Sequence, residues 1–210
     1  MVVYDCTTTR GLLDGVAAAV VAARSGKLVV LPTDTVYGVG CDAFDHGAVR
    51  ALLAAKGRGP QMPPPVLIGS MDTLDGLARD VPDYARELAA RYWPGPLTLV
   101  LLAHPSLQWD LGETNGTVAL RVPADDVASG VLGQVGPMAV TSANVTGHPA
   151  ATTVQEALDQ LGDSVAVYLD AGPSRGGAAS TILDCTGPEP VLLRAGAIPA
   201  EDLVNQPDAP

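Results

Sequence analysis

The sequence predicts an α/β fold in which helices flank a twisted, mixed β-sheet within a single domain. Apolar residues make up 47% of the 210-residue chain and charged residues 17%, a composition and length typical of one globular domain. Stretches with helical character alternate with short aliphatic runs, as in other α/β proteins. Several of these runs follow one another with no helix between them, which favours a mixed sheet over a strictly parallel one.

The predicted helices follow capping signals. Gly11–Arg24 is rich in Ala, Val and Leu, follows the Thr-rich segment Thr7–Thr9 and ends at Gly26, a pattern that predicts a buried helix. Asp45 is the expected cap of a second helix, Gly47–Ala55. Further helices are expected after the Ser70 cap, at Tyr84–Tyr92 after Pro82, and at Thr153–Leu161.

The predicted strands are short and mostly aliphatic. Leu28–Leu31 is closed by Pro32, and the continuous apolar run Leu97–Ala103 is typical of a central strand. The other predicted strands are Pro63–Ile68, Thr117–Val122, Met138–Thr141, Val165–Leu169, Ser180–Leu183 and Val191–Arg194. With no internal repeat and no long linker, we expect one domain over residues 1–204, followed by a flexible, Pro-rich tail at 205–210.

Charge and cysteine content exclude several classes of protein. The net charge of −11 makes most of the surface repel a phosphate backbone, so we do not expect tight binding of free nucleic acid. Cys6, Cys41 and Cys185 are odd in number and form no CxxC motif, so neither a disulfide framework nor a zinc site is predicted. No apolar run approaches the roughly 20 residues of a membrane span, and no signal-peptide pattern is present. We therefore expect a cytoplasmic protein with no membrane association.

Four polar segments at strand ends or turns are candidate binding sites. The first, Pro32–Gly38, has the sequence PTDTVYG and directly follows a predicted strand, where α/β proteins usually place ligand-binding groups. The same residues would also suit a simple capped turn. The second, Lys56–Pro60, places Lys56 and Arg58 at a helix C-terminus, where cations stabilise the helix dipole. Arg58 can also bind a carboxylate or phosphate with two parallel hydrogen bonds.

The other two segments lie in the second half of the chain. Thr141–Gly147 offers hydroxyl and amide groups for ribose and phosphate oxygens but matches neither a P-loop nor a Rossmann turn. Gly172–Gly177, followed by Ser180-Thr181 and by Arg194, can present backbone N–H groups to an anion or form a plain loop. The sequence has no GxSxG motif and its three histidines are scattered, so no resident nucleophile or metal cage is predicted. Such a site positions substrates and neutralises charge, which suits adenylyl transfer.

Together the four segments resemble the YrdC-like threonylcarbamoyl-AMP synthase family over about residues 8–199. The matching motifs are PTDTVYG at 32–38, KxR at Lys56 and Arg58, YWPGPLT at 92–98, RVP at 121–123, SAN at 142–144, GPSRGGAASTILD at 172–184 and LRAGAI at 193–198. Each motif is weak alone, but their order and spacing are highly specific. The resemblance implies one α/β domain whose twisted sheet surrounds a deep, positively charged central cavity.

The resemblance also implies an activity. The family condenses L-threonine, bicarbonate and ATP into threonylcarbamoyl-adenylate and pyrophosphate, and partner transferase proteins then use the adenylate to make threonylcarbamoyladenosine (t6A) in tRNA. The threonine amine captures CO2 or bicarbonate as a carbamate, and a carbamate oxygen attacks the α-phosphorus of ATP with no covalent enzyme intermediate. Mg²⁺ is expected to accompany ATP, with no ligands from protein side chains. The family also binds RNA, which the charge of −11 argues against here.

The resemblance further implies roles for individual residues. The implied catalytic residues, from the family's KxR and SxN signature, are Lys56, Arg58, Ser142 and Asn144. The implied ATP-binding residues are Lys56, Arg58, Thr117, Ala143, Asn144 and Arg194. The implied threonine-binding residues are Thr35, Arg121, Thr141 and Ser180. Lys56 and Arg58 would neutralise the triphosphate and the carbamate, and Arg121 would pair with the threonine carboxylate.

Three positions depart from the family pattern, and two alternatives stay open. Gly59 follows Arg58 where Pro is frequent, Pro64 replaces a downstream Leu, and Leu67 stands where a His is frequent. Longer members carry a second, C-terminal domain for which we expect no room here, so any lid would come from this domain or its tail. The alternatives are a related carbamoyl-adenylating enzyme, as in hydrogenase maturation proteins, and a non-catalytic RNA-binding module. Their signatures, CxxC motifs and a basic face respectively, do not occur in this sequence.

Overall fold

The computed structural model describes residues 1–204, so the tail predicted at 205–210 lies outside the described residues. In chain order the elements are β1 (Val2–Asp5), α1 (Thr9–Arg24), β2 (Val29–Leu31), β3 (Gly38–Asp42), α2 (His46–Ala55), β4 (Val66–Leu67), the 3₁₀ turn η1 (Met71–Thr73), α3 (Leu74–Leu77), α4 (Asp83–Tyr92), β5 (Leu97–Leu102), β6 (Thr117–Arg121), α5 (Asp126–Val135), β7 (Met138–Ser142), α6 (Val154–Leu161), the 3₁₀ turn η2 (Gly162–Ser164), β8 (Val167–Asp170), β9 (Thr181–Asp184), β10 (Val191–Arg194) and α7 (Ala200–Val204).

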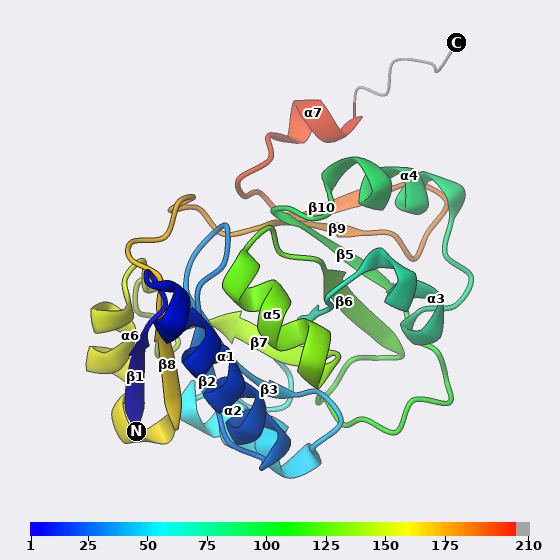
Figure 1. Cartoon of the computed structure of the whole chain (residues 1–210). Coiled ribbons are helices and arrows are strands. Elements are labelled where there is room, and N and C mark those ends of the chain that lie inside the picture. The colour runs from blue at the N-terminus through cyan, green and yellow to red at the C-terminus, as the bar shows by residue number, and fades with distance from the viewer. Residues whose placement is uncertain (205–210) are drawn as a thin grey trace.

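The strands form one mixed sheet in the order β1-β8-β2-β3-β7-β4-β6-β5-β9-β10 (Figure 1). β8 pairs in parallel with both β1 and β2, and the β4–β6 and β5–β9 pairs are also parallel. The β2–β3, β3–β7, β4–β7, β5–β6 and β9–β10 pairs are antiparallel. The predicted mixed sheet with flanking helices is therefore confirmed.

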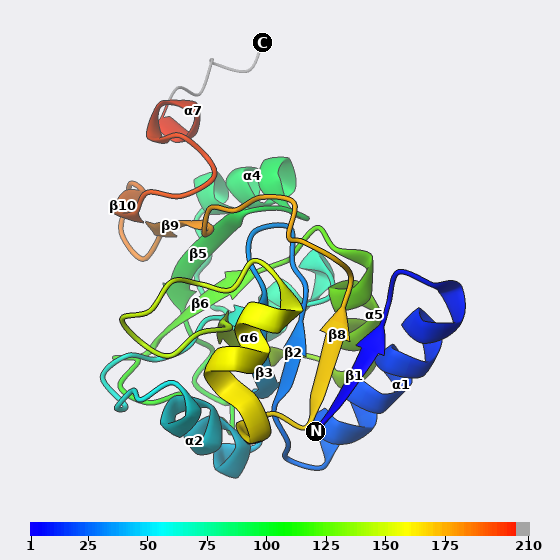
Figure 2. The ribbon, with the colours of Figure 1, turned by 90° about the vertical axis from the view of Figure 1, so that its left-hand side faces the viewer.

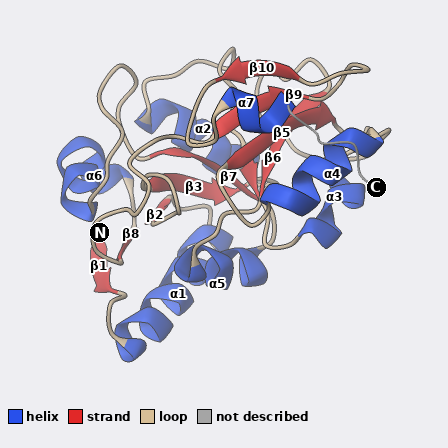
Figure 3. Cartoon of the chain, turned by 90° about the horizontal axis from the view of Figure 1, so that it is seen from above, coloured by secondary structure: helices blue, strands red, loops and turns tan. Residues whose placement is uncertain are grey.

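Alternating side chains divide the core into two layers. On β2, Val29 and Leu31 pack with α1 and α5, whereas Val30 packs in the opposite layer with α2 and α6. Figure 3 shows α1 and α5 together on one side of the sheet, with α2 and α6 on the other. In Figure 2, β1 and β8 lie between α1 and α6 at one edge. Because both faces of β2 are covered, its three residues are all aliphatic and buried.

The layer formed by α1 and α5 covers only part of its face of the sheet. Its apolar cluster reaches Leu67 of β4 but includes no described residue of β5, β6 or β9. The strand register places Leu67 opposite Arg121, and Val100 opposite Ala119, so these side chains continue the same face beyond the helices. That face therefore remains open to hold a ligand.

The structure adds elements that the sequence patterns did not predict, namely β1, β3, α5, the 3₁₀ turn η2 and α7. The predicted elements are found with ends shifted by a few residues. The capping predictions are confirmed for Asp45, whose side chain accepts from the Ala48 N–H, and for Ser70, whose side chain accepts from the Asp72 N–H. Over the described residues, no helix is both long and apolar enough to cross a membrane.

Candidate active site

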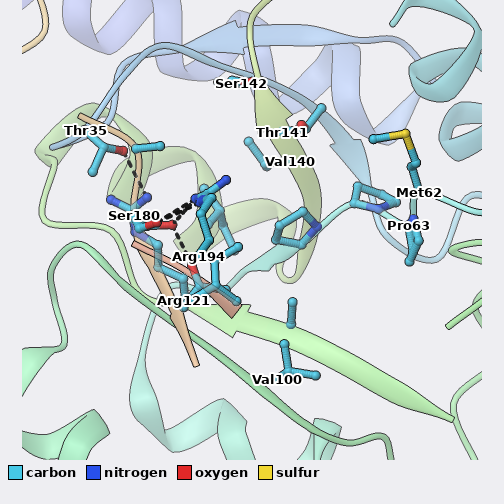
Figure 4. Close-up of a pocket in the computed structure, with 18 of the residues that line it drawn as sticks. Thr35, Met62, Pro63, Val100, Arg121, Val140, Thr141, Ser142, Ser180 and Arg194 are labelled. Atoms are coloured by element: carbon cyan, nitrogen blue, oxygen red, sulfur yellow. Dashed lines mark hydrogen bonds between the residues drawn. The ribbon is translucent and has the colours of Figure 1, made fainter. Parts of the chain in front are cut away.

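A cavity of about 500 Å³ opens on the uncovered face of the sheet. Its walls come from the turn after β2, the loop after α2, the strands β5, β6 and β7, and the β9–β10 pair. Figure 4 shows Thr35, Arg121, Ser180 and Arg194 gathered in one region, with Met62 and Pro63 farther along the cavity. The cavity thus has a polar, cationic part and an apolar part.

Arg121 is held in place by three groups. Its Nε donates to Gly95 O at 2.9 Å, its Nη1 to Thr35 Oγ1 at 3.0 Å and its Nη2 to Asp34 Oδ1 at 2.6 Å. Asp34 Oδ1 also accepts from the Ala124 N–H at 2.9 Å. Arg121 is only 6% exposed, so this ion pair is a buried one. The guanidinium is therefore positioned by the protein itself.

Arg194 lies in the same polar region (Figure 4), and its side chain is held by one neighbour. Its Nε and Nη2 donate to Ser180 O at 3.1 and 2.7 Å, and Nη2 also donates to Ser180 Oγ at 3.0 Å. Ser180 Oγ lies 2.8 Å from Oγ1 of Thr98, a residue of β5. This arrangement leaves Arg194 exposed on β10, with free donors for an anion.

Lys56 and Asn144 form a buried support behind the end of β7. The Lys56 ammonium donates to Ser142 O and to Asn144 Oδ1, the latter at 2.9 Å. Asn144 Oδ1 also accepts from Ser142 Oγ at 2.6 Å, while Asn144 Nδ2 donates to His148 O at 2.7 Å. These contacts orient the Ser142–Asn144 turn, whose Ser142 lines the cavity.

Arg58 contributes the third guanidinium. Its Nε donates to Thr146 Oγ1 at 3.0 Å and its Nη1 to Thr141 Oγ1 at 3.2 Å. Both partners are neutral, so no carboxylate offsets the charge of Arg58. Gly57, the residue before it, has a φ of 63°, a conformation that favours glycine and lets the chain turn out of α2.

The electrostatics of the cavity favour anions. Burial, and then the nearby charge of Arg58, lower the pKa of Lys56 to about 7. Burial likewise lowers the pKa of Arg58, of Arg121 and of Arg194, although guanidinium groups stay charged at neutral pH. The charge of an anionic ligand would offset the cost of this desolvation and the repulsion between the cations, so the site is suited to phosphate and carboxylate groups.

Comparison with known proteins places this site in a family. The Sua5/YciO/YrdC family model, described as "Telomere recombination", matches residues 21–196. The chain is 55% identical over 202 residues to a Mycobacterium tuberculosis protein assigned as a threonylcarbamoyl-AMP synthase, covering 96% of this chain and 93% of that protein. The chain belongs to the Sua5/YciO/YrdC family.

Two Pyrococcus abyssi comparisons add to this. A threonylcarbamoyl-AMP synthase of that organism is 39% identical over 181 residues, which cover 86% of this chain and 53% of that protein. The structure of P. abyssi Sua5 complexed with L-threonine superposes with a TM-score of 0.90 at 34% identity, covering 98% of this chain and 61% of that one. Sua5/YciO/YrdC members therefore include chains much longer than this one.

Most of the residues implied by the family resemblance meet at the cavity. Those that line it are Thr35, Arg58, Thr117, Arg121, Thr141, Ser142, Ser180 and Arg194. Lys56, Ala143 and Asn144 are buried behind this lining, at 0%, 0% and 6% exposure. The expected direct contact of Lys56 with a triphosphate stays a prediction, because its ammonium group is bonded within the protein.

Three further residues belong to the site by geometry. Thr33 hydrogen-bonds Thr35, Asp34 pairs with Arg121, and Thr98 hydrogen-bonds Ser180. The sequence carried a signal for each: Thr33 and Asp34 lie within PTDTVYG, and Thr98 is the single polar residue of the apolar strand β5. In two of the three cases the hydrogen-bond partner lies more than 80 positions away in sequence, so no local pattern identifies that partner.

Two of the three departures from the family pattern lie in the apolar part of the cavity. Leu67 and Pro64 line it together with Met62, Leu111 and Val118. Leu67 is adjacent to Arg121 in the β4–β6 register, so an aliphatic side chain here borders the polar region. Selectivity at this border is therefore open to test by substitution of Leu67.

Proposed function

We propose that this protein is a threonylcarbamoyl-AMP synthase that forms threonylcarbamoyl-adenylate and pyrophosphate from L-threonine, bicarbonate and ATP. The observation that carries the proposal is the convergence of Arg58, Arg121 and Arg194 on one cavity of about 500 Å³ in a chain of net charge −11. Membership of the Sua5/YciO/YrdC family and the resemblance to P. abyssi Sua5 with L-threonine support it.

The cavity is large enough for a small-molecule ligand and has two kinds of wall. Ligand pockets generally span about 300–1,000 Å³ and combine apolar surface with a few placed polar groups. The Pro63–Pro65 segment, Leu111 and Val118 offer the apolar surface that a base requires. The arginines and hydroxyls offer the groups that a triphosphate and an amino acid require. In this proposal the base of the nucleotide binds against the apolar part of the cavity, and the phosphates and the amino acid bind in the polar part.

The chemistry needs positioning and charge neutralisation. The threonine nitrogen bonds to the carbon of bicarbonate, and water leaves to give the carbamate. A carbamate oxygen then bonds to the α-phosphorus of ATP as the bond to the β-phosphate bridging oxygen breaks, releasing pyrophosphate. In this proposal Arg58 and Arg194 offset phosphate charge, and the Ser142–Asn144 turn positions the reacting groups, as their hydrogen bonds within the site support.

In this proposal Mg²⁺ enters with the ATP phosphates. Among the described residues no group of three or more His, Cys, Asp or Glu side chains could hold a metal ion. Mg²⁺ commonly binds through substrate phosphates and retains several waters, so it does not require a protein cage. The ion would reduce the repulsion between the triphosphate and the carbamate.

A product assay tests the proposed function. Purified protein is incubated with ATP, Mg²⁺, bicarbonate and either threonine, serine or glycine, and products are identified by mass spectrometry. Threonylcarbamoyl-adenylate should form with threonine, pyrophosphate release should require both threonine and bicarbonate, and Arg58→Ala should lose most of the activity. Activity indifferent to threonine argues against the assignment, and turnover of carbamoyl phosphate instead identifies the related carbamoyl-adenylating class.

The wider setting of the reaction follows from its product. A mixed anhydride of a carbamate and AMP is reactive, so a partner transferase must consume it to make t6A in tRNA. We place the protein in the cytoplasm, where a reducing environment suits its three free, buried cysteines. Because the chain is strongly acidic, we assign tRNA binding to the partner proteins and not to this chain.

A further inference from the structure

The turn after β2 carries two hydroxyl groups whose protons can be assigned. This inference rests on the proposed function, because it concerns how the cavity holds the amino acid. Thr33 and Thr35 are 5% and 2% exposed, both line the cavity, and their Oγ1 atoms lie 3.0 Å apart. The family resemblance assigns a ligand role to Thr35 alone.

The hydroxyl proton of Thr33 is committed to a backbone carbonyl. Thr33 Oγ1 lies 2.6 Å from Val36 O, which can only accept. No other donor to Val36 O is found among the described residues, so losing this bond would leave a buried carbonyl unpaired. The lone pairs of Thr33 Oγ1 accept from the N–H of Thr35 at 3.2 Å and from the hydroxyl of Thr35.

The proton of Thr35 is committed as a consequence. Because the Thr33 proton points to Val36 O, the hydroxyl of Thr35 is the donor between the two threonines. Arg121 Nη1 lies 3.0 Å from Thr35 Oγ1, and a guanidinium can only donate, so Thr35 accepts from it. One lone pair of Thr35 Oγ1 remains, which makes this hydroxyl an acceptor towards any ligand.

The hydroxyl pair near Arg194 differs, because it keeps a free proton. Thr98 and Ser180 hold two hydroxyl protons between them but share a single hydrogen bond of 2.8 Å, and Ser180 Oγ accepts from Arg194. Whichever of the two donates, one O–H has no acceptor among the described residues. The polar region therefore accepts a hydrogen bond at Thr35 and donates one at Thr98 or Ser180.

We propose that Thr33 is a positioning residue that fixes Thr35 as a hydrogen-bond acceptor, and that Thr35 receives an N–H or O–H donor of the amino-acid substrate. Threonine has two such groups, its amine and its hydroxyl. Its carboxylate can only accept and is therefore excluded from the free lone pair of Thr35. The carboxylate pairs instead with donors such as the guanidinium groups.

Calorimetric titration of the full chain with three ligands tests this assignment. The ligands are L-threonine, L-2-aminobutyrate, which lacks the hydroxyl, and 3-hydroxybutyrate, which lacks the amine. Thr33→Val keeps the side-chain shape but frees the Thr35 proton, so it should weaken threonine binding by about tenfold, as expected for one hydrogen bond. Thr33→Ser keeps the hydroxyl and should bind threonine within about twofold of wild type. The analogue lacking the group that Thr35 receives should bind wild type and Thr33→Val equally.

Kinetics provide a second readout, since Thr33→Val should raise KM for threonine by a larger factor than it changes KM for ATP. The proposal is overturned if Thr33→Val binds threonine like wild type, or if Thr33→Val binds all three ligands more weakly by the same factor. It is also overturned if Thr33→Ser does not bind threonine about as tightly as wild type. If Thr33→Val does not fold, Thr35→Val replaces it, because that variant keeps the Thr33 bond to Val36 O and should give the same ligand pattern. A wild-type chain that binds no threonine contradicts the proposed function itself, which is a separate result.

Discussion

Arg121 and Arg194 face the same cavity but are held in different ways. Arg121 is 6% exposed and bonds to Asp34, Thr35 and Gly95, all distant from it in sequence. Arg194 is exposed on β10, and each of its hydrogen bonds goes to Ser180. Within the described residues β10 pairs only with β9.

The difference shows that the cavity has a prebuilt wall at Arg121, which is oriented before a ligand binds, and an adaptable wall at Arg194, which a ligand can reorient. The orientation of Arg121 depends on the packing of the whole sheet, so it is set before any ligand arrives. The orientation of Arg194 depends on one neighbour, so a ligand can reposition it at small cost. We therefore expect substitutions at Arg121 to affect folding first, and substitutions at Arg194 to affect binding first.

The largest effect is expected for Arg121→Ala. It leaves the Asp34 carboxylate, whose side chain is 14% exposed, without its cation, and breaking such a buried pair costs about 3–5 kcal/mol of unfolding free energy. Urea unfolding at neutral pH measures the loss. The double variant Asp34→Asn, Arg121→Met should recover part of it, because no buried charge remains. A loss below about 1 kcal/mol would show that Arg121, like Arg194, contributes little to the unfolding free energy.

The next effect concerns pH and the buried Lys56. Its pKa is about 7 in the folded chain, against about 10.4 for a free lysine. Between these values the unfolded chain binds a proton that the folded chain does not. Burial of Lys56 therefore lowers the unfolding free energy by its full amount below about pH 7. This loss disappears as the pH rises towards 10.

Unfolding free energies of wild type and Lys56→Met at several pH values measure this effect. Their difference should shift in favour of wild type by about 1.4 kcal/mol per pH unit between about pH 7 and pH 10. A difference that does not change with pH would show that Lys56 remains charged in the folded chain. The prebuilt part of the site would then include a charged lysine.

A smaller effect, on binding only, is expected for Arg194→Ala. Loss of a charge-assisted hydrogen bond should weaken ATP binding by about tenfold to a hundredfold. The unfolding free energy should change by no more than about 0.5 kcal/mol, because the side chain is exposed. Calorimetry and urea unfolding measure the two quantities, with Arg50→Ala on the outside of α2 as the matched control. Strong destabilisation by Arg194→Ala would contradict the description of this wall as adaptable.

The smallest effect is expected for Thr98→Val. The substitution removes one buried hydrogen bond to Ser180 and should cost about 1 kcal/mol of unfolding free energy, while Ser180 keeps its bonds to Arg194. Thermal unfolding measures it. A cost above about 3 kcal/mol would indicate that the Arg194 wall is built as rigidly as the Arg121 wall.

The missed elements show where sequence patterns fail. α5 was not predicted because Gly130 and Gly133 lower its helix propensity. β3 was not predicted because Gly38 and Gly40 are unfavourable in strands. The reason for glycine on β3 is tertiary, since a Cβ at position 40 would lie 2.6 Å from a methyl group of Val140 on the neighbouring β7.

From the sequence alone, caps and aliphatic runs predicted the mixed α/β fold, because they are local signals. The resemblance carried by short polar motifs predicted the family and eight of the residues that line the cavity. The pairing of Asp34 with Arg121, which are 87 positions apart, and the burial of Lys56 beneath Ser142 emerge only in the folded chain. Both depend on which strands become neighbours and in what register. That choice is made by the packing of the whole sheet, so it decides which cations are neutralised, which are buried and which remain free for a ligand.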